Sequence, residues 1–386
     1  MMATKKLSDN QFVLLSFLVW RIVTLIPVII SGFFFKLQSN FLGGGMEAYT
    51  KNPLFFSWVN FDGEHYLNIA RNGYGSGEQA FFPLYPLLIK WVSGLFGLSG
   101  YSQMAIVGFI ISNVLFLASL FVLFRVIKEN ENTKLAKCSL ILMLLFPTSF
   151  YFGAVYTESL FLLSILLSVY FFFKEKYLLG GLLGIIASGT RVVGISLVPI
   201  YIFYLAFKKK LNLKNLLSSL LPSLGFLAYS FYQYKTYADP LKFFHVASSF
   251  GEQRSDHLIL LPQVFYRYFV KILPSLNWNY FPVVFTTLLE VFAALFVIWY
   301  LVSSILNIKR ENLVFLLISV CFFIIPTLSG SFSSLPRYVV VIFPLFVFLA
   351  KVLEGKNKYL TLLVYLLLGL LQVVAIMLFS RGYFVS

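Results

Sequence analysis

Residues 60–86 read N-F-D-G-E-H-Y-L-N-I-A-R-N-G-Y-G-S-G-E-Q-A-F-F-P-L-Y-P and concentrate ionisable groups in an otherwise apolar chain. The stretch holds Asp62, Glu64 and Glu78, three of only 15 acidic residues, together with His65, one of three histidines. A carboxylate held against a hydroxyl group can take its proton during group transfer. We therefore predict that this stretch is catalytic and that Asp62 is the general base.

The start of this stretch has the spacing of a short amphipathic helix from Phe61 to Arg71, which Gly73 would end. One predicted face carries Asp62, His65, Tyr66 and Ile69, and another carries Glu64, Leu67, Asn68 and Arg71. Positions two residues apart on a helix point about 200° apart, so only one of Asp62 and Glu64 can face a given cleft. Two alternatives remain: Asp62 as a helix N-cap, and Glu64 and Glu78 as solvated surface residues.

The chain that must position these residues has the composition of a membrane protein. It has 386 residues, of which 59% are hydrophobic and 12% charged, with a mean hydropathy of +0.86. Soluble domains average about 25% charged residues. The net charge of +15 comes from short basic clusters at the ends of apolar runs, which is typical of membrane topology and not of nucleic-acid binding. We predict an all-α polytopic membrane protein.

Eleven apolar stretches are candidate membrane spans. They are 12–35, 104–127, 136–152, 158–173, 177–190, 192–207, 213–234, 281–306, 312–328, 337–353 and 358–380. With the N-terminus inside, inner loops hold 17 Lys and Arg residues and the longer outer loops hold 12, so the positive-inside rule favours this orientation. We expect one membrane domain, 1–386, with two long outer loops, 36–103 and 235–280. Within the first, residues 81–91 are predicted to be re-entrant or interfacial.

Charged residues in or near the predicted spans are the next candidates. Arg191, in A-S-G-T-R-V-V-G, and Arg337, after S-F-S-S-L-P, could each hold a phosphate with paired N–H donors, or could reach lipid headgroups instead. Glu158 either joins a polar cluster or balances a helix dipole. Arg21 and Glu290 are interpreted as structural pairing residues.

The second outer loop offers Asp239, His245, Glu252 and Arg254. Asp239 precedes a proline and is first a turn residue. The aromatic neighbours of His245 suit stacking on a sugar, which makes it an acceptor-site candidate. No histidine pair has the i, i+4 ligand spacing and no D-x-D occurs, so we predict no dedicated metal site, although a divalent metal is not excluded.

The segment F-D-G-E-H-Y-L-N-I-A-R-N-G-Y, followed by E-Q-A-F-F-P-L-Y-P, resembles the signature of the PIG-V-like mannosyltransferases, relatives of GPI mannosyltransferase II in the GT-C superfamily. The pieces around Arg191 and S-L-P-R-Y-V-V-V-I-F-P-L-F around Arg337 and Tyr338 are similar to that family too. One position differs, because the family commonly has Trp before the Asp and this chain has Phe61. The length is similar to that of the shorter prokaryotic members.

The resemblance implies a GT-C-like bundle whose first outer loop holds the catalytic carboxylate. It also implies a sugar donor, usually mannose, on a polyprenyl or dolichyl phosphate, with Asp62 as base and Arg191 or Arg337 at the donor phosphate. We expect Glu64, His65, Tyr66, Glu78, Glu158, His245 and Tyr338 to complete the substrate site.

The resulting hypothesis is an inverting glycosyltransferase with no cofactor beyond its lipid-linked donor. The acceptor would be a glycolipid, a glycan or a protein on the outer face of the plasma membrane, or of the ER membrane in a eukaryote. The alternative is a lipid-sugar flippase or small-molecule transporter, which should carry charge at the bilayer midplane and often shows internal repeats.

Overall fold

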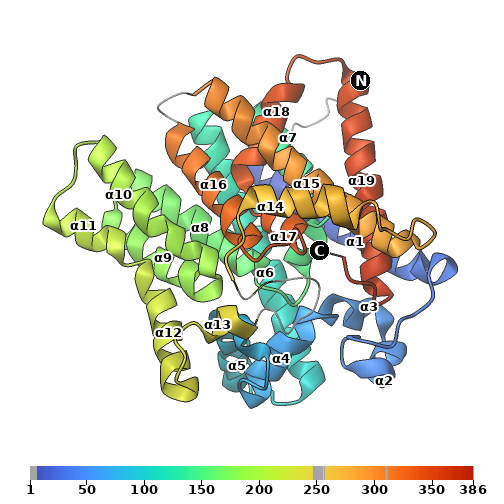
Figure 1. Cartoon of the computed structure of the whole chain (residues 1–386). Coiled ribbons are helices and arrows are strands. Elements are labelled where there is room, and N and C mark those ends of the chain that lie inside the picture. The colour runs from blue at the N-terminus through green and yellow to red at the C-terminus, as the bar shows by residue number, and fades with distance from the viewer. Residues whose placement is uncertain (1–6, 247–254, 256, 309–311, 386) are drawn as a thin grey trace.

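The computed structural model describes residues 7–246, 255, 257–308 and 312–385, and every regular element in them is helical (Figure 1). Four helices are long and apolar enough to cross a membrane. They are α1 (Asp9–Phe34), α6 (Tyr101–Asn130), α15 (Phe281–Leu306) and α19 (Lys358–Ser380). Shorter apolar helices pack beside them. The predicted all-α, polytopic membrane fold is confirmed.

The shorter helices of the bundle fill most of the other predicted spans. They are α7 (Thr133–Leu145), α8 (Glu158–Phe173), α9 (Tyr177–Thr190), α10 (Leu197–Phe207), α11 (Leu213–Leu220), α12 (Ser223–Tyr237), α16 (Leu313–Thr327), α17 (Leu335–Val339) and α18 (Phe343–Leu353). Three predicted spans are broken, each beside a proline: 136–152 after Leu145, 213–234 at Pro222, and 337–353 just before Pro344. Proline lacks the N–H that would continue the helical ladder.

Close backbone contact between α8 and α9 depends on small residues. Ser168 Oγ of α8 donates to the Gly180 carbonyl of α9 at 2.6 Å. A Cβ at Gly180 would lie 2.9 Å from the Ser168 carbonyl oxygen, which is closer than a real Cβ can come. Small residues let membrane helices approach closely. Here the close packing places the start of α8, at Glu158, beside the end of α9, which Arg191 follows.

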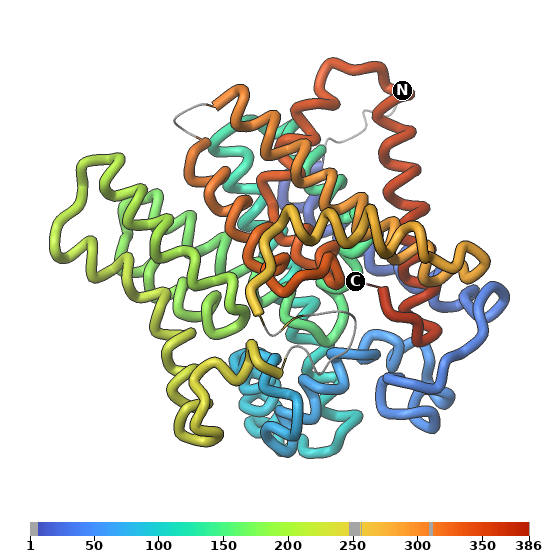
Figure 2. The backbone as a smooth tube through the Cα atoms, in the orientation of Figure 1, coloured from blue at the N-terminus to red at the C-terminus, as the bar shows by residue number. Residues whose placement is uncertain are grey.

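The first long loop folds into a group of short helices at one end of the bundle (Figures 1 and 2). They are α2 (Gly45–Lys51), α3 (Pro53–Phe56), η1 (Ser57–Val59), α4 (Asp62–Asn72), η2 (Glu78–Ala80) and α5 (Leu84–Leu95). The predicted helix from Phe61 is confirmed as α4, which ends at Gly73 with φ +83°. At 12 residues, α5 is about 18 Å long and too short to span a bilayer.

The second long loop contributes to the same end. Its helix α13 (Lys242–His245) packs against η2 (Figure 1). Further along, α14 (Leu261–Tyr266) packs against α16 and continues into a π-helical turn, η6 (Arg267–Ile272). Tyr268 of this turn donates to Glu290 at 2.7 Å, which confirms a pairing role for Glu290.

The opposite end of the bundle carries lysine-carboxylate pairs that join helix ends. Lys128 pairs with Asp9, Lys134 with Glu354, Lys174 with Glu129, and Lys351 with Glu131. We call this the lysine-rich end. Lysine side chains therefore gather at the far end of the bundle from α4.

Candidate active site

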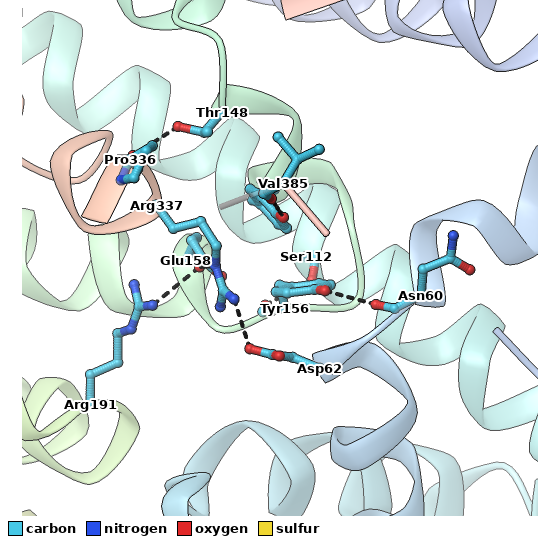
Figure 3. A network of polar contacts seen from close by, with 11 residues as sticks. Asn60, Asp62, Ser112, Thr148, Tyr156, Glu158, Arg191, Pro336, Arg337 and Val385 are labelled. Carbon is cyan, nitrogen blue, oxygen red and sulfur yellow. Dashed lines mark hydrogen bonds and ion pairs between the residues drawn. The ribbon is translucent and has the colours of Figure 1, made fainter. Parts of the chain in front are cut away.

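Asp62 lies in a network of four charged side chains drawn from distant parts of the chain (Figure 3). Arg337 Nη1 donates to Asp62 Oδ2 at 2.8 Å, and its Nε donates to Glu158 Oε1 at 3.0 Å. Arg191 Nη2 donates to the same Glu158 oxygen at 3.2 Å. The network brings together Asp62, Glu158, Arg191 and Arg337, all of which the sequence marked as site residues.

The network is buried and formally neutral. The exposed fraction is 0% for Glu158, 4% for Arg337 and 8% for Arg191, and 22% for the Asp62 side chain, which is the most open of the four. The cost of burying such charges is offset only when they are paired and hydrogen-bonded. Glu158 Oε2 and Arg191 Nη1 are buried without a hydrogen-bond partner among the described residues. The site therefore has unused bonding capacity beside the ion pairs.

Aromatic rings hold the two guanidinium groups in place. The Arg337 guanidinium lies 4.8 Å from the ring centres of both Tyr151 and Tyr156. The Arg191 guanidinium lies 4.5 Å from the ring of Tyr338, another predicted site residue. Cations over aromatic faces are attracted by the ring quadrupole, most strongly when water is excluded. Both arginines are thus oriented before any ligand binds.

The chain turns sharply just before Asp62. Phe61 has φ +58° and ψ −117°, an uncommon conformation for a residue with a bulky side chain. Its N–H donates to the Phe41 carbonyl at 2.9 Å, and its ring packs between Phe379 and Phe384. Backbone strain of this kind persists where the surroundings over-determine it, typically at functional sites. The N-cap of α4 is Phe61, so Asp62 is the first helical residue and not the N-cap.

Asn60 anchors this turn. It is fully buried; its Oδ1 accepts from the Gly43 N–H and its Nδ2 donates to the Phe379 carbonyl, both at 2.8 Å. Its own carbonyl accepts the hydroxyl of Tyr156 at 2.7 Å (Figure 3). Because Tyr156 also contacts Arg337, Asn60 ties the turn to the network that Asp62 joins.

A second face of α4, which includes His65 although His65 was predicted to share the Asp62 face, borders a separate polar pocket of about 370 Å³. Its lining comprises Glu64, His65, Asn68, Arg71, Asn72, Glu78 and Tyr101. Glu64 accepts from the Gly44 N–H and the Tyr101 hydroxyl, and so faces away from Asp62. The helical spacing predicted this division of the two carboxylates.

His65 and Glu78 form an ion pair at the edge of this pocket. His65 Nδ1 lies 3.1 Å from Glu78 Oε1, and Asn68 Nδ2 and the Gly75 N–H also donate to Glu78. The His65 ring stacks on Phe81. Glu78 is buried, so its predicted alternative as a solvated surface residue is wrong.

The pKa values of the pocket residues follow from these contacts. Burial opposes a charge on His65, but the hydrogen bond with Glu78 and the surrounding carboxylates outweigh it and raise the pKa of His65 above 6.5. Burial would raise the pKa of Glu78, but hydrogen bonds from His65, Asn68 and a backbone N–H lower it below 4.5. Burial raises the pKa of Glu64 although two donors favour its charged form.

Comparison with protein-family models matches residues 10–243 to Mannosyltransferase (PIG-V). The matched segment is more than half of the chain. The chain belongs to the PIG-V mannosyltransferase family. It is therefore a membrane glycosyltransferase that moves mannosyl groups from a sugar donor to a glycan or lipid acceptor. No curated protein matches it.

The PIG-V match includes Asp62, Glu158 and Arg191 but ends before Arg337. Tertiary packing brings Arg337 to the site. Its helix α17 packs against α15 and α16, and the Arg337 guanidinium donates to Asp62 and Glu158. Thr148 supports this placement by donating to the Pro336 carbonyl at 2.8 Å (Figure 3).

Three residues of the candidate site were not predicted from the sequence: Asn60, Tyr151 and Tyr156. All three lie close in sequence to predicted residues, Asn60 before Asp62 and the tyrosines before Glu158. The two tyrosines lie in an apolar stretch, so the sequence did not distinguish them from aromatic residues that only pack in the membrane bundle. No pattern in the sequence marked Asn60, because the turn at Phe61 that it anchors is visible only in the structure.

Other predicted site residues have defined positions. Tyr66 is buried and packs edge-on against Tyr85. His245, half exposed on α13, lies 2.8 Å from Asp239, and this hydrogen bond lowers the pKa of Asp239. Arg21 lies 4.2 Å over Trp58, in agreement with its predicted structural role.

Glu252 and Arg254 lie outside the described residues. Within the part of the chain that the structure describes, no three His, Cys, Asp or Glu side chains are grouped as metal ligands would be.

Replacing Asn60 by Ala is expected to lower mannosyl transfer more than it lowers stability. The change leaves the buried Gly43 N–H without its acceptor, at a cost of about 1–3 kcal/mol, whereas the Phe379 carbonyl still accepts from the Gly382 N–H. Misplacement of the Asp62 turn by about 1 Å would cost ~10²-fold in kcat. Thermal unfolding and initial rates measured on one preparation separate the two effects. A variant with lower unfolding temperature and unchanged kcat would leave Asn60 a purely structural role.

The His65–Glu78 pair is expected to stabilise the protein most in mildly acidic solution. The raised pKa of His65 gives a contribution that is complete below pH 6.5 and is lost as the pH rises through the folded-state pKa. The lowered pKa of Glu78 gives a contribution to stability that is present above pH 4.5 and is lost on acidification. The difference in Tm between wild type and His65→Gln should therefore be largest between these values and shrink by pH 9. A constant difference from pH 5 to 9 would contradict this prediction.

Proposed function

We propose that this PIG-V family member is an inverting mannosyltransferase whose donor is mannose linked to a polyprenyl phosphate. Asp62 is the base that takes the proton of the acceptor hydroxyl. The observation that carries the proposal is the contact of Asp62 with Arg337 inside a buried network of two carboxylates and two guanidinium groups. An inverting displacement needs one base and positive charge near the leaving group.

Proton transfer changes the charge balance of the network in the direction that the reaction needs. The four groups are formally neutral at rest. As the acceptor oxygen bonds to the anomeric carbon, Asp62 takes its proton and the sugar–phosphate bond breaks with its electron pair on the phosphate. The network then carries one excess positive charge when the departing phosphate gains negative charge. In a water-excluded site such matched charge stabilises the transition state strongly.

The two arginines are assigned different roles. Arg337 bonds to Asp62 and Glu158 at once, so it orients the base and supplies charge at short range. Arg191 has its buried Nη1 without an acceptor among the described side chains, which suits direct donation to the donor phosphate. Glu158 and Tyr338 hold Arg191 for that contact.

The acceptor is proposed to approach over α4. Glu64, His65 and Glu78 line a polar pocket there that suits a hydroxyl-rich glycan or glycolipid head. His245, on α13 beside η2, is assigned to the same side, whereas Tyr66 is buried on the face of α4 that carries Asp62. The position of the lysine-rich end opposite α4 supports a site on the outer face of the membrane, because basic residues gather on the cytoplasmic side.

Purified protein in sealed vesicles, supplied with radiolabelled mannosyl polyprenyl phosphate or with labelled GDP-mannose, tests the proposal. Transfer of label from the lipid donor to a membrane or glycan acceptor, with release of polyprenyl phosphate, is the expected result. Transfer of label from GDP-mannose but not from mannosyl polyprenyl phosphate would refute the proposal that the donor is lipid-linked. Passage of intact lipid donor across the vesicle without transfer would favour a flippase.

A further inference from the structure

At the lysine-rich end, α7, α18 and α19 enclose a cavity of about 480 Å³ that the transfer reaction does not use. We call it the α7–α19 groove. One wall follows Lys134, Cys138 and Ile141 along α7, at i, i+4 and i+7. The wall on α19 follows Lys358, Leu362 and Tyr365 with the same spacing. The groove therefore runs along the two helix axes, into the membrane-spanning part of the bundle.

The mouth of the groove is basic. Lys134, Lys356 and Lys358 border it, and Glu354 is the only acidic residue in the lining. Glu354 pairs with Lys134 at 3.4 Å. No carboxylate among the described residues forms an ion pair with Lys356 or Lys358. Two positive charges therefore remain in excess where the groove opens.

The deep part of the groove is apolar and closed. Two polar groups at this depth, the Cys138 thiol and the Tyr365 hydroxyl, pair with each other at 3.1 Å. One turn further, a Cβ at Gly369 would lie 3.6 Å from Leu145 Cδ2, so α7 and α19 are in contact at that level. On the outer side of α19, Leu363 and Leu366 are exposed by 60% and 62% and continue the apolar surface.

We propose that the α7–α19 groove binds an anionic phospholipid, with the headgroup phosphate at the three lysines, the first part of an acyl chain between α7 and α19, and the rest of that chain over the exposed Leu363 and Leu366. A basic mouth over an apolar channel matches an amphiphile with a negative head. A free phosphate would leave the apolar channel unused. Lysines at a membrane surface attract anionic lipid, and a groove in line with the helix axes holds the chain parallel to those of the bilayer.

Lipid retention by the purified protein tests this site. Protein is incubated with phosphatidylglycerol or phosphatidylcholine in detergent, and bound lipid is counted by native mass spectrometry. We expect wild type to retain phosphatidylglycerol in preference, and K134Q/K356Q/K358Q to retain about tenfold less of it. The matched control is K208Q/K209Q/K214Q, which removes three exposed lysines near the α10–α11 turn, away from the groove.

A second variant tests the apolar part. Thr361→Trp adds bulk to the α19 wall and should block phosphatidylglycerol retention while the three lysines remain. Unfolding temperatures confirm that each variant is folded. Equal loss of lipid in the groove and control lysine variants would show non-specific attraction and overturn the proposal. Unchanged retention in K134Q/K356Q/K358Q or in Thr361→Trp would overturn it as well.

Discussion

Asp62→Asn is expected to abolish mannosyl transfer while the protein still folds. The amide cannot accept the proton of the acceptor hydroxyl, and loss of a general base costs on the order of 10²–10⁴ in rate. Folding should survive because the Asn oxygen can still accept the hydrogen bond from Arg337, which now reaches Asp62 at 2.8 Å. Transfer from the lipid-linked donor, and Tm measured on the same preparation, check both parts of the prediction.

Glu47→Gln provides the matched control for Asp62→Asn. Glu47 lies at the same end of the bundle, on α2, with its side chain 84% exposed and, among the residues that the structure describes, paired only with Lys51. Its replacement removes one carboxylate outside the buried network and should leave transfer unchanged. Near-normal turnover by the Asp62 variant, with the control also active, would remove Asp62 from the role of base.

Arg337→Met is expected to abolish transfer and also to destabilise the protein by about 3–5 kcal/mol. The change takes away the shared cation and leaves Asp62 and the fully buried Glu158 facing each other without it. Breaking a buried ion pair from one side is costly because the remaining charge stays desolvated. Chemical or thermal unfolding compared with wild type measures the loss.

The double variant Glu158→Gln/Arg337→Met separates stability from catalysis. Removing one charge of each sign leaves Asp62 with Arg191 as the remaining charges of the network, so a large part of the lost stability should return. Transfer should not return, since Asp62 has lost the group that orients it. If Arg337→Met alone unfolds at the wild-type temperature, the network contributes nothing to stability and the argument from burial fails.

The helical pattern of the site loop could be predicted because it depends on local spacing. The sequence placed a helix from Phe61 with Gly73 at its end, and α4 runs Asp62–Asn72. It also separated Asp62 from Glu64 by their angle on the helix, and the two carboxylates face Arg337 and Tyr101 respectively. Both results follow from the 3.6-residue period, which needs no tertiary information.

Boundaries of the spans were less predictable. Residues 337–353 were predicted to form one span, but the helix is interrupted between α17 and α18. Hydropathy averages over about 20 residues and does not detect a short break that a proline and local packing impose. That break matters, because it places Arg337 on its own short helix beside Asp62.

The sequence by itself determined that this chain is a helical membrane protein and that Asp62, Glu158, Arg191 and Arg337 are unusual among apolar neighbours, and it led to the prediction that residues 60–86 carry the chemistry. These conclusions come from composition and from periodicity along a single segment. The tertiary structure alone decided which charges meet: Asp62 bonds to a residue 275 positions away, and Glu158 joins two arginines. Pairing over such distances depends on how the helices pack, and no local pattern records it.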